Sequence, residues 1–340
     1  MARLLDFPKM LRLVGPVEFA RRIIRQVFDD NLFTWAAALA YSWLFALFPF
    51  LLFLLALIPY LPLHFKGQAE DFVKASLDKY MPTEAAHAVR DNIEGNVKNL
   101  LHVQRGAVLY IGLLLAMWAA SNGVAATMTA LDKCYDIERG RPFYRQRIIA
   151  LVITIAVVVL LVLVGALLPI AGGVRDWVLA HRPALIKDIQ WIVPLFDIAR
   201  YLLSGLFLMT VLAMFYHKGP SVKHRFRFIT PGSVFCLIAW LLLGSVLRFY
   251  MNKMGESSYD RTYGALGGVA VLLLSFYVDA LMLLIGAEIN SEIDFEVLKV
   301  RRGSRNFMEA EKAAHPDEPE PPADEISTAV DTTATQSPES

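Results

Sequence analysis

Two acidic residues lie in the most apolar part of the sequence. Sixteen uncharged residues, Tyr263–Val278, are followed by Asp279 and then by Glu288. On a helix, Asp279 lies about 24 Å and Glu288 about 37 Å from Tyr263. A carboxylate at membrane depth costs about 2.5–3.5 kcal/mol on insertion scales. Asp279 is therefore a candidate for a proton or cation relay, or a neutral acid that hydrogen-bonds to a neighbouring helix. Glu288 is expected near the interface, where it pins the helix end or pairs with an arginine.

A second candidate pairs an arginine with an acid. Asp197 and Arg200 are three positions apart, so they share one face of a helix and can form an ion pair. Arg200 lies about 13 Å inward from Trp191 on a helix. A guanidinium binds phosphate or carboxylate through two parallel hydrogen bonds. Arg200 is therefore expected either to contact an anionic substrate or simply to pair with Asp197.

Asn122 is the third candidate, between Ser121 and Gly123, with Thr127 and Thr129 on the same segment. Small and amide residues let helices approach closely and hydrogen-bond to each other in the membrane, which predicts a packing role. Gly123 also permits local unwinding, as in broken-helix substrate sites. Asn122, Arg200, Asp197 and Asp279 are the substrate-path candidates.

Patterns of catalytic or metal-binding residues are absent from the sequence. Its seven histidines form no HxH, HxxxH or HExxH motif, and no P-loop, GxSxG or CxxC occurs. Cys134 and Cys236 fit neither a disulfide framework nor a metal site. Basic clusters flank apolar segments and have few aromatic neighbours. We therefore expect no enzyme activity, metal, cofactor or nucleic-acid partner.

Six apolar segments must position these residues. The chain has 340 residues, of which 56% are hydrophobic, and a mean hydropathy of +0.46. Each segment is long enough to cross a hydrocarbon layer of about 30 Å, with some tilt. The first contains Pro49, which is expected to kink its helix. The predicted spans are Leu32–Pro59, Gly106–Leu131, Ile148–Ala171, Trp191–Tyr216, Phe228–Tyr250 and Tyr263–Glu288.

Charge predicts the orientation of these spans. Twenty basic residues flank the spans on the side of both termini, and twelve lie on the opposite side. Basic residues concentrate in cytoplasmic segments. Both termini are therefore expected in the cytoplasm.

Three regions lie outside the predicted six-span domain or between its spans. Residues 1–30 are basic and amphipathic, with Pro16 at a helix start, and are expected either in the membrane interface or packed on the protein's own loops. Residues 60–105, within the transmembrane domain 31–295, are expected to form an external helical segment. Residues 296–340 are basic and then acidic, and the acidic part, 309–340, is expected to be disordered.

Several short motifs resemble the YihY/BrkB family of bacterial inner-membrane proteins. They cover about residues 20–295 and include Ala38-Leu39-Ala40-Tyr41, Phe48-Pro49 and Gly286-Ala287-Glu288-Ile289-Asn290. The resemblance implies an all-α, multi-pass protein with six transmembrane helices. Family members bear the names ribonuclease BN, virulence or serum-resistance factor, and transporter, so the resemblance implies no agreed activity. The motif residues expected to be structural are Tyr41, Pro49, Tyr216, Pro220, Pro231, Gly232, Tyr263, Gly264, Gly267, Gly286 and Glu288.

The polar residues at membrane depth favour a transporter or flippase-like protein for an amphipathic or anionic solute, such as a lipid. A non-transporting scaffold that supports the envelope is the alternative. The lipid bilayer is the one partner that the sequence predicts in either case. The sequence identifies neither a coupling ion nor an oligomeric state.

Overall fold

The protein is described from a computed structural model, which covers residues 6–57, 106–138, 140–181, 192–254, 259–307 and 310. The expected external segment 60–105 and the acidic tail beyond residue 310 lie outside the described residues. Within the described ranges the chain is helical, apart from one isolated β-bridge between Lys223 and Asn306. The expected all-α fold is confirmed.

Eight helices make up the described fold. Six of them are long, and each coincides with one predicted span. The first two helices are short and amphipathic, and the second begins at Pro16, as expected. The helices are α1 (Asp6–Val14), α2 (Pro16–Asp29), α3 (Leu32–Leu57), α6 (Gly106–Cys134), α7 (Phe143–His181), α9 (Ile192–Lys218), α10 (Pro231–Met254) and α11 (Tyr259–Leu298).

Four of the long helices are long and apolar enough to cross a membrane within their described parts. These stretches are Leu32–Leu51, Leu114–Cys134, Phe143–Val164 and Gly268–Leu298. The described apolar stretches of α9 and α10 are shorter, Leu202–Lys218 and Pro231–Val246. The chain is thus a multi-pass membrane protein, and the count of six spans stays a prediction.

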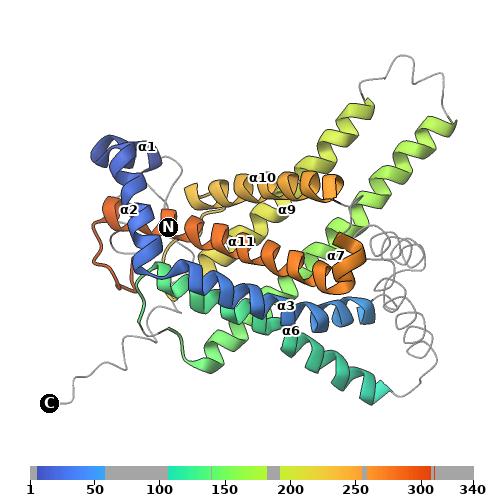
Figure 1. Ribbon diagram of the computed structural model, residues 1–340, viewed down its shortest axis with the longest axis horizontal. Coiled ribbons are helices and arrows are strands. Elements are labelled where there is room, and N and C mark those ends of the chain that lie inside the picture. The colour runs from blue at the N-terminus through green and yellow to red at the C-terminus, as the bar shows by residue number, and fades with distance from the viewer. Residues whose placement is uncertain are drawn as a thin grey trace.

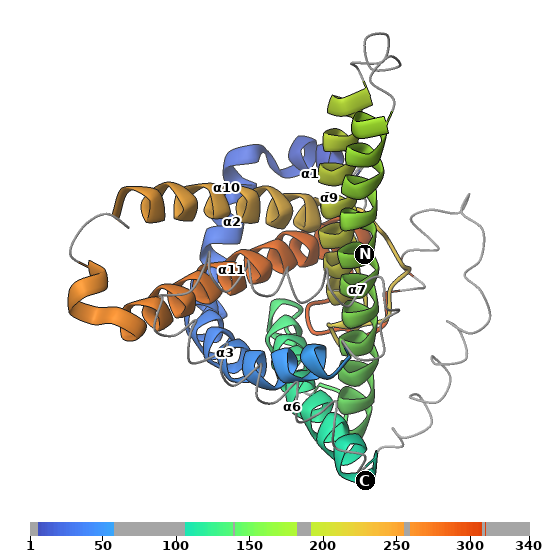
Figure 2. The same cartoon turned by 90° about the vertical axis from the view of Figure 1, so that its right-hand side faces the viewer.

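The long helices meet at one end of the molecule and spread toward the other (Figures 1 and 2). We call the packed end the hub. It comprises α1, α2, the adjoining ends of α6, α9 and α10, the connections that follow α6 and α9, and residues 283–307. Figure 2 shows α7 and α9 side by side, at a steep angle to α11.

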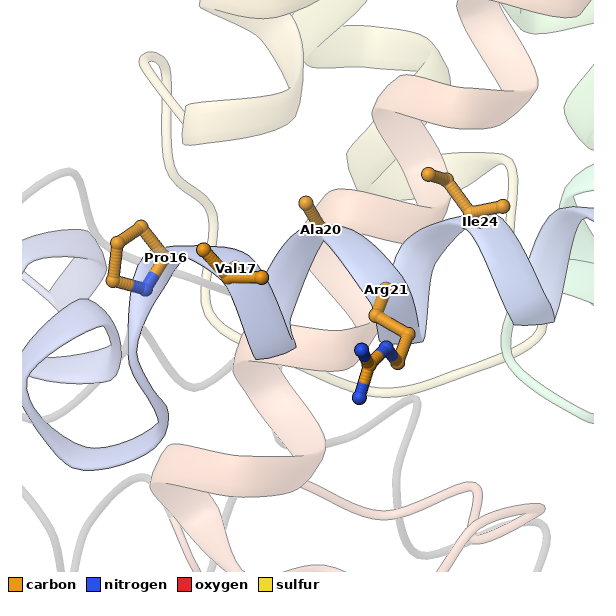
Figure 3. A pocket seen from close by; sticks show the side chains of 5 residues that line it. All are labelled: Pro16, Val17, Ala20, Arg21 and Ile24. Carbon is orange, nitrogen blue, oxygen red and sulfur yellow. The ribbon is translucent and has the colours of Figure 1, made fainter.

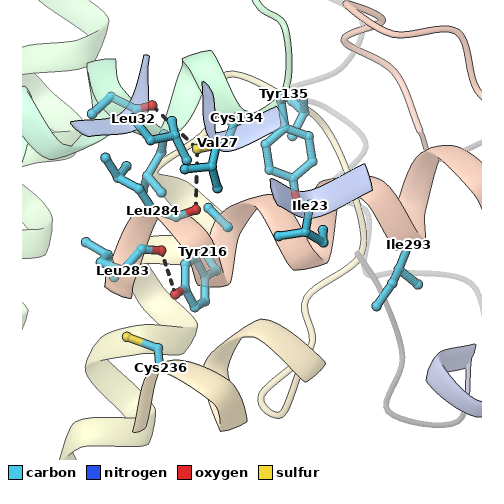
Figure 4. Close-up of a cluster of buried hydrophobic side chains, with 14 of the residues drawn as sticks. Ile23, Val27, Leu32, Cys134, Tyr135, Tyr216, Cys236, Leu283, Leu284 and Ile293 are labelled. Atoms are coloured by element: carbon cyan, nitrogen blue, oxygen red, sulfur yellow. Dashed lines mark hydrogen bonds between the residues drawn. The ribbon is translucent and has the colours of Figure 1, made fainter. Parts of the chain in front are cut away.

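Buried apolar side chains from almost every element fill the hub (Figure 4). Tyr216 is 1% exposed, and its hydroxyl donates a hydrogen bond to the Leu283 carbonyl over 2.9 Å. The Cys134 thiol lies 3.6 Å from the Leu284 carbonyl oxygen, and Cys134 and Cys236 are both free and buried, as expected. A buried polar group must find a partner inside the protein. These bonds therefore tie α6 and α9 to the backbone of α11.

Two glycines let α10 and α11 touch backbone to backbone. A Cβ on Gly232 would lie 1.8 Å from the Gly286 carbonyl oxygen, and one on Gly286 would lie 2.3 Å from the Tyr216 hydroxyl. Asn290 adds a specific link, because its Oδ1 accepts the Gly232 N–H at 2.9 Å. Its Nδ2 donates to Thr230 Oγ1 at 3.1 Å. Only glycine fits at these two positions, because a Cβ at either one would overlap neighbouring atoms.

The start of α10 is also fixed locally. Thr230 and Ser233 cap each other, since each backbone N–H donates to the other residue's hydroxyl at 2.9 and 3.1 Å. Pro231 occupies the first helical position, where no intrahelical donor is needed. This end of α10 therefore reaches α11 as a rigid unit.

Asp132 and Arg141 hold the connection after α9. The Asp132 carboxylate accepts bonds from the Ser221 N–H and from the Ser221 hydroxyl, the latter at 2.8 Å. Arg141 donates to three successive carbonyls, those of Lys218, Gly219 and Pro220, at 2.6–2.9 Å. Burial lowers the pKa of Arg141 from its ordinary value, yet a guanidinium stays charged at neutral pH.

The segment after α11 folds back on the same connection. Lys223 donates its N–H to the Arg305 carbonyl at 2.8 Å, and Phe307 donates to the Lys223 carbonyl at 2.9 Å. The Phe307 side chain is completely buried. Residues 299–307 are thus part of the hub.

Ion pairs close the remaining side of the hub. Arg22 of α2 lies 3.5 Å from Glu292 and 3.0 Å from Glu296 of α11. Arg302 pairs with Glu292 and, at 3.1 Å, with Asp136. Glu292 is buried, so its carboxylate depends on these arginines for compensation of its charge. These contacts fasten α2 and the end of α11 to each other.

We predict that Gly232→Ala destabilises the protein by about 1–3 kcal/mol, because the added methyl group forces α10 away from α11. The thermal unfolding midpoint in detergent measures this. Gly244→Ala is the matched control in the same helix, since a Cβ there meets no atom within 4 Å. Equal midpoints for the two variants would contradict the close contact.

Replacing Asp132 by alanine should cost more stability than Ser221→Ala. The first change strips the Ser221 N–H and hydroxyl of their acceptor, at about 1–3 kcal/mol, whereas the second removes one bond of about 1 kcal/mol. Because the residues share bonds, the double variant should be less destabilised than the sum of both. Strict additivity in chemical denaturation would disprove this coupling.

Candidate functional site

A hollow of about 240 Å³ lies between α3 and α6, and we call it the side groove. Its α3 residues recur at helical spacing and its α6 residues are three apart, so each helix presents one face to it. Its lining holds one predicted site residue, Asn122, and two motif residues, Tyr41 and Pro49. The lining residues are Tyr41, Ser42, Phe45, Ala46, Pro49, Ala119 and Asn122.

The contact between α3 and α6 beside this groove is specific. The Trp43 indole N–H donates to Thr127 Oγ1 at 2.9 Å. Gly123 packs against Ala46, and a Cβ on Gly123 would lie 3.1 Å from the Ala46 methyl carbon. Small and hydroxyl residues on α6 thus form the close helix contact that the sequence indicates. They fix Asn122 at the edge of the groove.

Arg147 of α7 stands behind Asn122. One guanidinium nitrogen donates to Asn122 Oδ1 at 2.5 Å, and another donates to the Trp118 carbonyl. The guanidinium carbon lies 3.8 Å from the centre of the Trp118 ring, which adds a cation–π attraction. Neighbouring Gln146 anchors α7 on α6 through the Ala125 carbonyl at 3.0 Å.

This arginine is buried, and no acidic partner is found for it among the described residues. Arg147 is 6% exposed, and its Nε makes no hydrogen bond. The ion pairs among the described residues do not include Arg147. Asn122 lies about 18 Å along α6 from Cys134, near the middle of the helix. Within the described residues, the Arg147 guanidinium is therefore held by neutral groups, one turn after the start of α7, and its charge is available to an anion.

The walls around this charge are apolar and face outward. Tyr41 is 61% exposed and its ring lies 4.5 Å from that of Phe45, which is 59% exposed. Phe48 and Trp118 are also exposed. In a membrane these side chains contact lipid, since a spanning helix has no water around it. Arg147 is not among the lining residues, but through Asn122 it lies directly behind this apolar opening, an arrangement that suits an amphipathic anion.

The four predicted substrate-path residues have different outcomes in the structure. Asn122 lies in the side groove, whereas Asp279 is not among its lining residues. Asp279 is half-buried, and its carbonyl accepts the Trp240 indole N–H at 3.1 Å. Asp197 and Arg200 lie in α9, with side chains outside the described residues. Their predicted role in a substrate path stays a prediction.

Glu288 differs from its expected position. It is completely buried, and neither carboxyl oxygen has a hydrogen-bond partner within the described ranges. The reason is that α11 continues to Leu298 and α2 packs across it, so Glu288 is no helix end. The arginine pairing expected for Glu288 goes instead to Glu292, one turn further on.

Arg147 was missed as a site residue. By sequence it belongs to a basic cluster between two predicted spans, and positive-inside topology accounts for it there. In the structure α7 begins at Phe143, five positions before the predicted Ile148, so Arg147 lies inside the helix. The sequence feature that could have indicated this site is the polar pair Gln146–Arg147 directly before an apolar run. In the structure this pair contacts α6 at Ala125 and Asn122.

Most motif residues that the structure describes meet in the hub. Tyr216, Pro220, Pro231, Gly232 and Gly286 all lie at the contacts between α9, α10 and α11 or in the connection that joins them. Tyr41 and Pro49 line the groove instead. Tyr263, Gly264 and Gly267 lie in α11, with side-chain surroundings outside the described part.

Two buried groups in the hub stay uncharged. Burial, together with the Asp294 carboxylate, raises the pKa of Tyr135 well above its ordinary value, so its hydroxyl donates to Asp294 at 3.3 Å. Burial lowers the pKa of His224 well below its ordinary value. The His224 ring stacks on Tyr135 at 6.4 Å. Among the described residues, no group of three His, Cys, Asp or Glu side chains could hold a metal ion.

Comparison with known proteins agrees with this architecture. A family model described as virulence factor BrkB matches residues 23–310. The ribonuclease-like protein YfkH of Bacillus subtilis is 34% identical over 260 residues, which is 75% of this chain and 88% of that protein. A UPF0761 membrane protein of Tolumonas auensis is 25% identical over 83% of this chain and 87% of its own length.

A further UPF0761 membrane protein, from Xanthomonas axonopodis, is 24% identical over 82% of this chain and 61% of its own length. No solved structure matches the chain. The family model extends over the six long helices and the second half of α2, and so includes the side groove and most of the hub. The chain therefore belongs to the BrkB family of membrane proteins.

Proposed function

We propose that the protein is a carrier, of transporter or flippase type, for an amphipathic anion such as an anionic lipid. The observation that supports this is Arg147, a buried cation without an acidic partner among the described residues, beside an apolar side groove. We place the protein in the bacterial inner membrane, with the hub and both termini in the cytoplasm, because basic residues concentrate there.

In this proposal Asn122 occupies the position on Arg147 that the ligand would take. Its Oδ1 binds Arg147 as a phosphate or carboxylate oxygen would, but without charge. An anionic head group displaces this oxygen and forms two parallel, charge-assisted hydrogen bonds. The apolar part of the ligand lies along Tyr41 and Phe45.

Pro49 contributes to the opening of the groove. It lies inside α3, removes a backbone hydrogen bond and leaves a carbonyl free in the wall. A helix interrupted in this way bends at lower cost. Movement of α3 at Pro49 is thus the step that we expect to widen the groove.

We infer that this function is not enzymatic. The groove lining contains no carboxylate, imidazole or thiol, and the Ser42 hydroxyl donates to the Ala38 carbonyl, so no described base activates it as a nucleophile. The ribonuclease-like name belongs to the Bacillus relative. Nucleic-acid cleavage has no support in the side groove.

The scaffold hypothesis remains the second candidate. It is favoured by the hub, in which hydrogen bonds and ion pairs join α2, α6, α9, α10 and α11. A scaffold needs this packing but not the charge of Arg147. Variants of Arg147 therefore separate the two functions.

We predict that Arg147→Gln lowers transport of an anionic phospholipid at least ten-fold, because a hydrogen bond to a charged group contributes about 1.5–3 kcal/mol. The transport rate of Arg147→Lys should lie between those of the wild type and Arg147→Gln, since lysine keeps the charge but cannot bind bidentately. The assay measures translocation of fluorescent phosphatidylglycerol in proteoliposomes, by dithionite quenching. Arg145→Gln is the matched control, as it removes the same charge two positions away.

Asn122→Asp provides the sharper test. A carboxylate at this position neutralises Arg147 permanently, so it should abolish transport while leaving thermal stability unchanged or increased. A scaffold would keep its envelope phenotype in this variant. Wild-type transport by both Arg147→Gln and Asn122→Asp would disprove the proposed carrier site.

A further inference from the structure

Helix α2 carries two separate apolar stripes. The first consists of Phe19, Ile23 and Val27, which are buried against the hub. The second consists of Val17, Ile24 and Phe28, which are 74%, 59% and 63% exposed. At 100° per residue the stripes are about 120° apart on the helix. Packing on the protein accounts for the first stripe, whereas the second stays largely exposed and its one described ring contact is that of Phe28 with Phe33.

The second stripe borders a shallow, open hollow of about 500 Å³ (Figure 3). Ala20 and Ile24 project to one side of α2, and Arg21 extends away from them. The hollow is lined by Pro16, Val17, Ala20, Arg21 and Ile24. Its surface is therefore apolar with a cation at the edge.

The arginines of α2 divide between two directions. Arg22 points to the hub and pairs with Glu292 and Glu296. Arg21 is 67% exposed, and among the described residues it pairs with exposed Glu18 at 3.3 Å, a contact that contributes little to stability. Arg25 is exposed next to it. Positive charge is thus left free along the same side as the second stripe.

The position of α2 brings this stripe to the level of the membrane surface. The Phe28 ring lies 5.5 Å from that of Phe33, which is 41% exposed in the first turn of α3. α3 is one of the helices able to cross a membrane. In Figure 1, α2 runs across the direction of α3 and α11. Its exposed apolar stripe is therefore continuous with the outer face of a spanning helix.

We propose that the second stripe of α2 docks into an anionic phospholipid surface. Val17, Ile24 and Phe28 enter the boundary between head groups and acyl chains, and Arg21 and Arg25 bind lipid phosphates. A helix with one apolar face and basic residues beside it binds membranes in this way. This inference concerns a surface distinct from the side groove, and it holds whether or not the groove carries a ligand.

Charge favours lipid over a second copy of the chain. Two copies joined through this stripe would bring their exposed arginines together, whereas a phosphate surface neutralises them. Docking also links the membrane to the hub, because the opposite stripe of α2 packs there. A surface that binds the folded state stabilises it by mass action.

The test places an environment-sensitive fluorophore on α2 of the full chain in proteoliposomes. Ile24→Cys carries the label on the second stripe, and Asp29→Cys carries it on the exposed polar face as the matched control. Cys134 and Cys236 are buried, so labelled wild type gives the background. Vesicles contain phosphatidylcholine alone or with phosphatidylglycerol, with and without nitroxide-bearing lipid.

We expect lipid nitroxide to quench the label at position 24 and to leave the label at position 29 bright. Phosphatidylglycerol should increase the docked fraction, and Arg21→Gln with Arg25→Gln should reduce this gain about five-fold per arginine. Equal quenching at both positions, or no effect of the anionic lipid, would overturn the proposal. So would energy transfer between labelled copies in place of lipid quenching. Each variant must retain the wild-type unfolding midpoint.

Discussion

The backbone contact between Gly232 and Gly286 is the constraint on which the hub depends. Only hydrogen atoms fit at these two Cα positions. The contact brings Asn290 to the start of α10 and leaves room for the Tyr216 hydroxyl at Leu283. In a membrane, where apolar burial drives helix association weakly, close packing and hydrogen bonds must supply the attraction. Two glycines therefore make possible the junction of three helices.

The hub is the rigid part of the structure, and the side groove is the part that can open. The connection at Ser221 is held by a carboxylate, by an arginine and by the segment that returns after α11. Beside the groove, one described side-chain hydrogen bond, from Trp43 to Thr127, joins α3 to α6, and the rest of this contact is apolar packing. Elements with many buried bonds open rarely, while sparsely bonded ones supply the moving parts. The proposed carrier thus moves α3 against a fixed base.

Much of the fold could be predicted from sequence, because apolar length and helical periodicity are local properties. The start of α2 at Pro16 and the six long helices are examples. Family motifs pointed to Gly232 and Gly286, although the sequence does not tell that these glycines touch. Glu288 was misplaced, since the length of α11 beyond it depends on α2 and on residues 299–307 packing there. Arg147 was missed because its pairing with Asn122 needs the register between α6 and α7, which no single segment encodes.

The neutral partner of Arg147 has an electrical consequence. In the proposed carrier, the positive charge of Arg147 lies behind Asn122 at the edge of the groove, and a monovalent anion that binds there cancels this charge. A charge moved across the whole membrane gains or loses about 2.3 kcal/mol per 100 mV, so a site halfway across experiences about half of this. Occupation by an anion is therefore sensitive to membrane voltage, which opposes its entry from one side and favours it from the other. A zwitterionic molecule in the same groove would not respond to voltage in this way.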